Sequence, residues 1–174
     1  EILKDLDRKG RIELLAGEVA LIPAEGPPQL PESLESLVRA RVDALEPGAK
    51  LSLQVASILS PSFDGELLQL CVPNVELELV LRTLIERGLL APEGEASADR
   101  YAFATQLIWE VVRGTIVGSQ LRDQHFRVSE GIEQHFEGRL EGHYEALAEH
   151  CASGGRLLDG ARYFELAGDA HRLM

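Results

Sequence analysis

An arginine and an aspartate stand two residues apart in Arg41-Val42-Asp43, within the segment LPESLESLVRARVDAL that spans residues 30–45. The apolar residues of this segment recur at helical spacing, so we expect one helix with a single apolar stripe. Arg41 lies beside that stripe and Asp43 points away from it. The spacing alone leaves open whether the pair does chemistry or holds the fold together.

The remaining side chains that could bind a metal or act as nucleophiles are scattered. Five histidines occur without an HExxH or HxxxH pattern: His125, His135, His143, His150 and His171. Glu149, His150 and Cys151 are consecutive, so a helix points them in different directions and they cannot share a metal ion. Cys71 and Cys151 are far apart in sequence. We therefore expect no metal and no disulfide, and two thiols that pack as small apolar side chains.

The motifs of common enzyme classes do not occur in the sequence. It has no GxxxxGK[ST] loop, no GxGxxG after a predicted strand and no GxSxG. Acidic pairs such as Glu76/Glu78 and Glu93/Glu95 read as solvated faces or loops, and no set of nucleophile, base and orienting group is recognisable. We expect that this chain is not an enzyme in its own right.

Composition limits the classes of protein further. The chain has 174 residues, 45% of them hydrophobic and 5% aromatic, which predicts an aliphatic core in one medium or two small domains. The formal net charge of −12 argues against binding to polyanions. Neither a signal peptide nor a membrane-spanning apolar run is recognisable, so a cytoplasmic location is expected. The first residue is Glu1, not Met, and we expect a piece of a longer protein.

The order of predicted elements indicates the fold. Residues 1–10 form a predicted helix, and two short strands are predicted around Ala16-Gly17. Helices are predicted near residues 31–45, 49–59, 64–70 and 77–87, with Pro61 to Asp64 as a turn. Two strands, at Leu89-Leu90 and around Tyr101 to Phe103, follow the fourth of these. Three long helices followed by a β-hairpin are typical of a winged helix, and from Thr105 onward every segment is predicted to be helical.

Charge argues against the DNA-binding role that a winged helix suggests. From residue 31 to residue 105 the sequence has six basic and twelve acidic residues. The helix that would enter the groove has Glu76, Glu78 and Glu86 against Arg82 and Arg87. Such a helix would be repelled by phosphates and would release no counterions.

Most of the chain resembles a known family. The segments LPESLESLVRARVDAL and LSLQVASILSPSFDGELL resemble the region after the nucleotide-binding domain of bacterial STAND-type ATPases. These AAA-like modules are attached to class III adenylate or guanylate cyclases, to protein kinases and to LuxR-type transcription regulators. LRTLIERGLL is similar to the family's helix before the wing, and LAEHCASGG with ARYFELAGDAH is similar to its first tetratricopeptide-like (TPR-like) helices. The chain departs from the family pattern at Thr105, where the family often has His, and at Gln124-His125, where it has Leu-His.

The resemblance implies a mainly α fold in three parts. They are a lid remnant and hairpin over residues 1–28, a winged-helix domain with a small β-hairpin wing over 29–104, and TPR-like antiparallel helices over 105–174. The 34-residue TPR consensus itself is absent. The implied function is a non-catalytic regulatory module of an ATP-dependent signalling protein that couples nucleotide state to a partner or effector. ATP or ADP and Mg²⁺ would bind in the parent's upstream domain.

The implied partners are that upstream ATPase domain and proteins that bind the helical region, with no nucleic acid and no membrane. Arg41 is the candidate nucleotide sensor. Asp43, Phe63, Phe103 and His150 are the candidate interdomain or structural residues. Two alternatives stay open: a DNA-binding winged-helix transcription regulator and an autonomous TPR-like scaffold that binds peptides. For Arg41 and Asp43, the structural interpretation is that they tie their helix to a neighbouring helix or to the lid.

Overall fold

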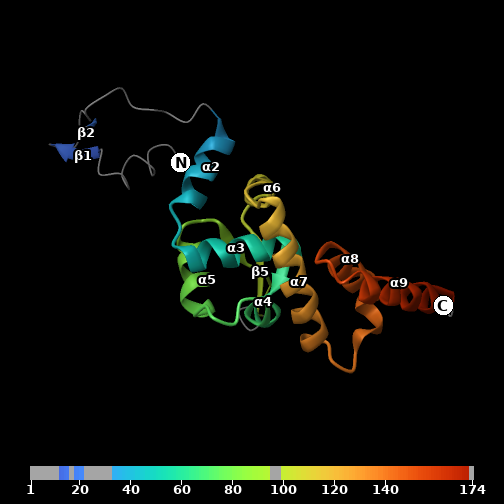
Figure 1. The fold of residues 1–174 in the computed structure, drawn as a ribbon. Helices are drawn as coiled ribbons and strands as arrows, with labels where there is room; N and C mark the ends of the chain where they lie inside the picture. Colours follow the sequence, from blue (N-terminus) through green and yellow to red (C-terminus); the bar gives the residue numbers. More distant parts are fainter. Residues whose placement is uncertain (1–11, 16–17, 22–32, 95–98, 173–174) are drawn as a thin grey trace. The chain divides into compact units, whose positions relative to one another are not determined.

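The protein is mainly helical, with two small antiparallel sheets (Figure 1). A computed structural model describes residues 12–15, 18–21, 33–94 and 99–172. The chain divides into two compact units, Glu1–Ser33 and Leu34–Met174. The predicted helix over residues 1–10, the Ala16-Gly17 turn and the proline-containing connector before residue 33 lie outside the described residues.

The first unit contains a pair of antiparallel strands. Strand β1 (Ile12–Leu15) pairs with β2 (Glu18–Leu21), with Ile12 opposite Leu21 and Leu15 opposite Glu18. The two short strands predicted on either side of Ala16-Gly17 are therefore confirmed.

Of the three long helices that begin the second unit, the first and the last each bury one apolar stripe, whereas the middle one is buried over most of its surface. Helix α2 (Leu34–Asp43) buries Leu37, Val38 and Val42, as the helical spacing predicts. Helix α3 (Pro47–Leu59) begins at a proline, which has no N–H to leave unsatisfied at that position. The apolar stripe predicted for α3 was wrong in part, because Leu51 and Leu59 are only half-buried and Leu53 is fully buried. Helix α5 (Leu77–Glu86) buries Leu77, Leu81 and Leu84. Gly88 follows at φ 63°, a left-handed conformation that glycine adopts readily and that ends the helix.

A three-stranded antiparallel sheet completes this part of the unit. Strand β5 (Arg100–Phe103) is central, between β3 (Ser62–Asp64) and β4 (Leu90–Pro92). The β4–β5 pair lies where the sequence predicts a wing, and its identity as a wing stays a prediction. The prediction of a turn from Pro61 to Asp64 was wrong, because Ser62–Asp64 pairs with Arg100–Ala102. Three residues are too few to show strand alternation, so only the distant partner makes this segment a strand.

The helix after β3 confirms a predicted cap. Helix α4 (Gly65–Cys71) begins after Asp64, whose Oδ1 accepts a hydrogen bond from the Leu67 backbone N–H at 3.1 Å. Asp64 therefore ends a strand and starts a helix within one residue.

The rest of the second unit is helical. It comprises α6 (Gln106–Gly114), α7 (Gly118–His135), the short 3₁₀ helix η1 (Leu140–His143), α8 (Tyr144–Ser153) and α9 (Leu157–Arg172). Thr105 caps α6, because its Oγ1 accepts from the Ile108 N–H at 3.3 Å. Helix α7 packs on α3 and α4 and also on α8, and α8 packs along α9 (Figure 1). The predicted boundary between residues 104 and 105 falls inside this compact unit, and it stays a prediction.

The core is aliphatic and includes both cysteines, which are free and buried as expected. Burial raises the pKa of the Cys71 thiol to about 12, so the unreactive thiol form dominates at neutral pH. In the described part of the chain, no helix has both the length and the apolar character needed to cross a membrane.

Candidate functional site

Arg41 fastens the end of α2 to the end of α5. Its Nη2 donates a hydrogen bond to the carbonyl oxygen of Arg87, and Arg87 Nη1 donates in return to the carbonyl oxygen of Ala44 at 3.2 Å. Arg87 is the C-terminal cap of α5, where carbonyl groups lack helical partners and a positive charge is favourable. This reciprocal pair, which we call the arginine clamp, matches the structural interpretation of Arg41.

Asp43 joins α2 to α3. Its Oδ1 lies 2.6 Å from Lys50 Nζ, and the two side chains are 56% and 33% exposed. An ion pair this exposed contributes little to stability, because water and salt screen it. Asp43 therefore bridges the turn between α2 and α3 without adding much stability. Its partner Lys50 also lines a pocket beside α3.

Phe63 and Phe103 lie together inside the three-stranded sheet. Both are buried, and their ring centroids are 6.2 Å apart in an edge-to-face arrangement. Tyr101 stacks on Phe63 with centroids 6.1 Å apart. The aromatic cluster holds β3 against β5, so the structure places these two predicted residues in the core and not on a binding surface.

His150 pairs with a histidine that the sequence pattern did not connect to it. Its Nδ1 lies 2.9 Å from Nδ1 of His125, across the α7–α8 contact. Burial lowers the pKa of His150 to about 4, with the His125 and Arg113 charges adding to the effect, and burial also lowers the pKa of His125. Both rings are therefore neutral at pH 7, and one nitrogen can donate to the other.

Among the described residues, one trio of potential metal ligands converges. Ligand atoms of Asp64, Glu66 and His135 all lie within 4.8 Å of one another. Asp64 already caps α4, and Glu66 stands in the first turn of the same short helix, where acidic side chains are favourable without any metal. The two carboxylates thus have a structural explanation.

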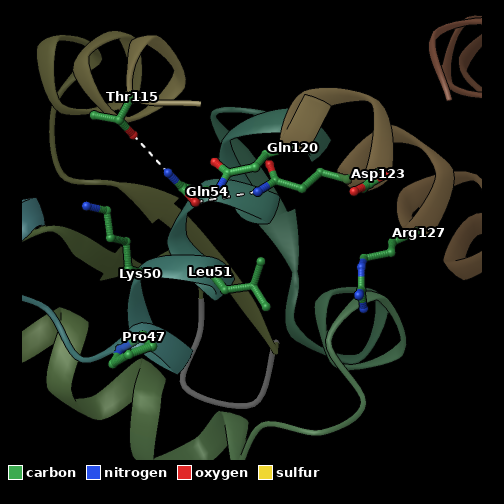
Figure 2. A pocket seen from close by; sticks show the side chains of 9 residues that line it. Pro47, Lys50, Leu51, Gln54, Thr115, Gln120, Asp123 and Arg127 are labelled. Carbon is green, nitrogen blue, oxygen red and sulfur yellow. Dashed lines mark hydrogen bonds between the residues drawn. The ribbon is translucent and has the colours of Figure 1, made fainter. Parts of the chain in front are cut away.

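A pocket of about 470 Å³ lies between α3 and α7 (Figure 2). Polar and charged side chains predominate in its lining, which consists of Pro47, Lys50, Leu51, Gln54, Thr115, Gln120, Asp123, Gln124 and Arg127. Figure 2 shows Lys50 and Arg127 on opposite sides of the pocket, with Leu51 between them. The Gln120 side chain points toward Gln54. Its two cations and several amide groups make this polar pocket a candidate ligand site.

Two buried glutamines connect the helices behind this pocket. Gln54 is 6% exposed and Gln124 is 3% exposed. Gln124 Nε2 donates to Gln54 Oε1 at 3.4 Å, and Gln54 Nε2 donates to Thr115 Oγ1 at 3.0 Å. This series of hydrogen bonds ends at Thr115, whose Oγ1 donates to the carbonyl oxygen of Val112 at 2.6 Å.

One acceptor in this series of hydrogen bonds has no donor among the described residues. Gln124 Oε1 is buried and accepts no hydrogen bond from any residue that the structure describes. A buried polar atom without a partner costs about 1–3 kcal/mol, and such atoms are rare in folded proteins. The arrangement is therefore built at a cost to stability, which is common at binding sites.

Sequence reasoning did not identify the polar pocket. None of its lining residues was a candidate, because glutamine in a helix ordinarily reads as a solvated position. A signal was present at Gln124, which stands where the resembled family has Leu before its His. A polar residue at a position that the resemblance makes apolar points to a buried amide, although it does not reveal its partner Gln54.

Comparison with known proteins found no matching family model, no matching curated protein and no matching solved structure.

Proposed function

We propose that this chain is a non-catalytic regulatory and interaction module of a multidomain ATP-dependent signalling protein. The region from α2 to β5 acts as a winged helix that follows an ATPase domain, and α7 to α9 act as the start of a TPR-like array. The module passes a change in nucleotide state from the ATPase domain to a partner or effector. ATP or ADP and Mg²⁺ bind in the ATPase domain and not in this chain.

The observation that supports coupling is the position of α7. This helix packs on α3 and α4 at one side and on α8 at another. Gly131 of α7 approaches Cys71 of α4 so closely that an added Cβ would lie 2.5 Å from the sulfur. Close packing of this kind moves as one body, so a displacement of the winged helix would carry α8 with it.

The surface of α9 supports an interaction role. Leu157, Leu158 and Phe164 are 69%, 89% and 49% exposed on this helix. Isolated apolar side chains on a surface are ordinary, but three on the outermost helix of a stacked pair are typical of a repeat that packs against further protein.

A DNA-binding role has less support. Helix α5 has Glu78 and Glu86 against Arg82, and Arg87 at its end is engaged in the arginine clamp. A helix with more acidic than available basic side chains binds a phosphate backbone poorly.

The test uses the parent protein. We expect the native gene to encode a P-loop and an acidic Mg²⁺-binding strand upstream of Glu1. Hydrogen exchange of that parent is expected to differ between ATP and ADP in residues 34–45 and 77–88, where the arginine clamp lies. Exchange of α4, away from the clamp, serves as the internal control. A parent without a P-loop, or identical exchange in both nucleotides, would overturn the proposal.

Arg41 has its own test within this proposal. If Arg41 also senses the nucleotide phosphate, Arg41→Ala in the parent changes the preference for ATP over ADP while the fold stays intact. Arg87→Ala is the matched control, because it removes the reciprocal bond of the arginine clamp and leaves Arg41 in place. An equal effect of both variants would assign Arg41 a structural role alone.

A further inference from the structure

The polar pocket combines features that are unusual in so acidic a protein. The chain has a formal net charge of −12, yet this pocket is lined by two cations, Lys50 and Arg127, and by one anion, Asp123. Lys50 is already paired with Asp43. Arg127 makes no hydrogen bond or ion pair with the residues that the structure describes, so its guanidinium is available to an anionic ligand.

The back of the pocket offers hydrogen bonds to a neutral ligand. Gln54, Thr115, Gln120 and Gln124 provide amide and hydroxyl groups, which can both donate and accept. Asp123 adds a carboxylate that accepts two donors. Gln124 Oε1 still requires a donor, as shown above. A ligand hydroxyl can donate to that oxygen and accept from a neighbouring amide, so a polyhydroxylated ligand fits this set of groups.

The lining also argues against other anions. No aromatic side chain lines the pocket, so a nucleobase would find no ring on which to stack. Fatty acids are disfavoured because Pro47 and Leu51 are the only apolar side chains among the lining residues. The volume of about 470 Å³ falls within the range of small-molecule sites in proteins.

We infer that the polar pocket binds a phosphorylated sugar, with the phosphate at Arg127 and sugar hydroxyls at the Gln54–Gln124–Thr115 chain. Gln120 precedes Gln124 by about one helical turn, is exposed and points toward Gln54 (Figure 2), so its long side chain can turn to admit the sugar. This inference does not depend on the proposed role in an ATP-dependent protein, because a ligand at α3 and α7 would bind the isolated chain.

The first experiment is calorimetric titration of the 174-residue chain with glucose-6-phosphate. Glucose and inorganic phosphate are titrated separately as the two halves of the ligand. We expect glucose-6-phosphate to bind at least about tenfold more tightly than either half, because both regions of the pocket contribute. Equal affinity for inorganic phosphate would indicate a simple anion site and overturn the assignment. A dissociation constant weaker than about 10 mM for the sugar phosphate would do the same.

Gln124→Leu tests the hydroxyl region. Leucine has a similar volume and removes the unpaired Oε1, but it also leaves the buried Gln54 Oε1 without its donor. The melting temperature should therefore fall modestly relative to the unsubstituted chain while the fold persists. Affinity for glucose-6-phosphate should fall about tenfold, whereas the weak affinity for inorganic phosphate should not change. Gln134→Leu, at an exposed position of the same helix outside the pocket, is the matched control and should leave both affinities unchanged.

Arg127→Gln tests the phosphate region and does not depend on the behaviour of a buried variant. Arg127 is exposed, so the variant should fold. Affinity for glucose-6-phosphate should fall about tenfold or more, and binding of inorganic phosphate should be lost. Arg122→Gln, another exposed arginine of α7, controls for net charge. Equal losses from both arginine variants would mean that charge alone attracts the ligand, and the site would be rejected.

Discussion

The two ends of the second unit are held together by different forces. From α2 to β5, the buried contacts are mostly aliphatic and aromatic, and fully buried side chains such as Leu53, Leu68 and Leu84 fill the interior. From α7 to α9, a hydrogen-bonded network centred on Arg156 is added to the apolar packing of Val128 and Leu147. Arg156 donates to both oxygens of Glu133 at 2.8 and 2.9 Å and to Asp159 at 2.8 Å. The Tyr163 hydroxyl donates to Glu133 Oε1 at 2.9 Å.

This difference predicts which part of the second unit should change in stability with pH and salt. Apolar burial does not depend on pH or on moderate salt, whereas charged networks and buried histidines do. The hydrogen bond to Glu133 raises the pKa of Arg156, which is charged in any case, and burial raises the pKa of Tyr163 to about 12. We therefore expect α7 to α9 to be the responsive part of the unit and α2 to β5 to be the constant part.

The largest expected loss of stability comes from removing apolar burial in α5. Leu81 of α5 is 6% exposed, so Leu81→Ala should lower the free energy of unfolding by about 2–5 kcal/mol, through lost burial and a residual cavity. Urea denaturation measures this value. Leu79→Ala is the matched control, because Leu79 lies on the same helix at 46% exposure and should change little. A loss at Leu81 below about 0.5 kcal/mol would contradict the packing of α5.

The next largest loss of stability is expected when the charged network loses Arg156. Arg156→Ala should cost about 1–3 kcal/mol, because Glu133 loses a two-bond partner in a half-buried position. Arg172→Ala is the control, since its pair with Asp169 is 83% and 70% exposed and should contribute little. Denaturation at low and high salt should show that the cost at Arg156 decreases with salt. Equal costs for the two variants would remove the contrast between the two parts.

Two glycines of the helical part should give opposite changes in stability when each is replaced by alanine, because only one of them lies against another helix. A Cβ at Gly154 would lie 2.7 Å from the backbone nitrogen of Phe126, and backbone cannot move aside cheaply. Gly154→Ala should therefore cost about 1–3 kcal/mol. Gly168, within α9, has nothing within 4 Å of its added Cβ, so Gly168→Ala should stabilise by about 0.5–1 kcal/mol through helix propensity. Thermal melts of both variants check the signs. A stabilising Gly154→Ala would contradict the α7–α8 packing, and a destabilising Gly168→Ala would contradict the open space beside α9.

The last expected effect is a pH dependence of stability at His150. In the unfolded chain its imidazole takes up a proton near the ordinary pKa of about 6.5, but in the fold only near a pKa of about 4. Between these values the unfolded chain binds more protons, so stability falls as the pH falls from about 6.5 toward 4. We expect a loss of about 1–2 kcal/mol by about pH 5, where most carboxylates are still charged.

His150→Gln should flatten this pH dependence in urea denaturation. Substitution of His143, whose pKa is also lowered by burial but which lies outside the pair, is the control. An unchanged slope in His150→Gln would show that carboxylates and not the His125–His150 pair cause the acid response.

Much of the local structure could be predicted from the sequence because it depends on near neighbours. Apolar spacing predicted the stripes of α2 and α5, Asp64 predicted the start of α4, and Gly88 predicted the end of α5. The buried free thiols also followed from their apolar surroundings. In each case the physical cause, a cap, a turn or a helical period, is complete within a few residues.

The tertiary structure decided everything that required a distant partner. Residues 62–64 are a strand only because β5 lies beside them, and the pKa of His150 is lowered by its burial in the α7–α8 contact, with His125 beside it. The role of Arg41 depends on a carbonyl 46 residues away, and the Gln54–Gln124 bond joins residues 70 apart. Side-chain spacing along one helix contains no information about which atom of another helix lies opposite, so the sequence determined which surfaces are apolar and the packing determined which polar groups meet.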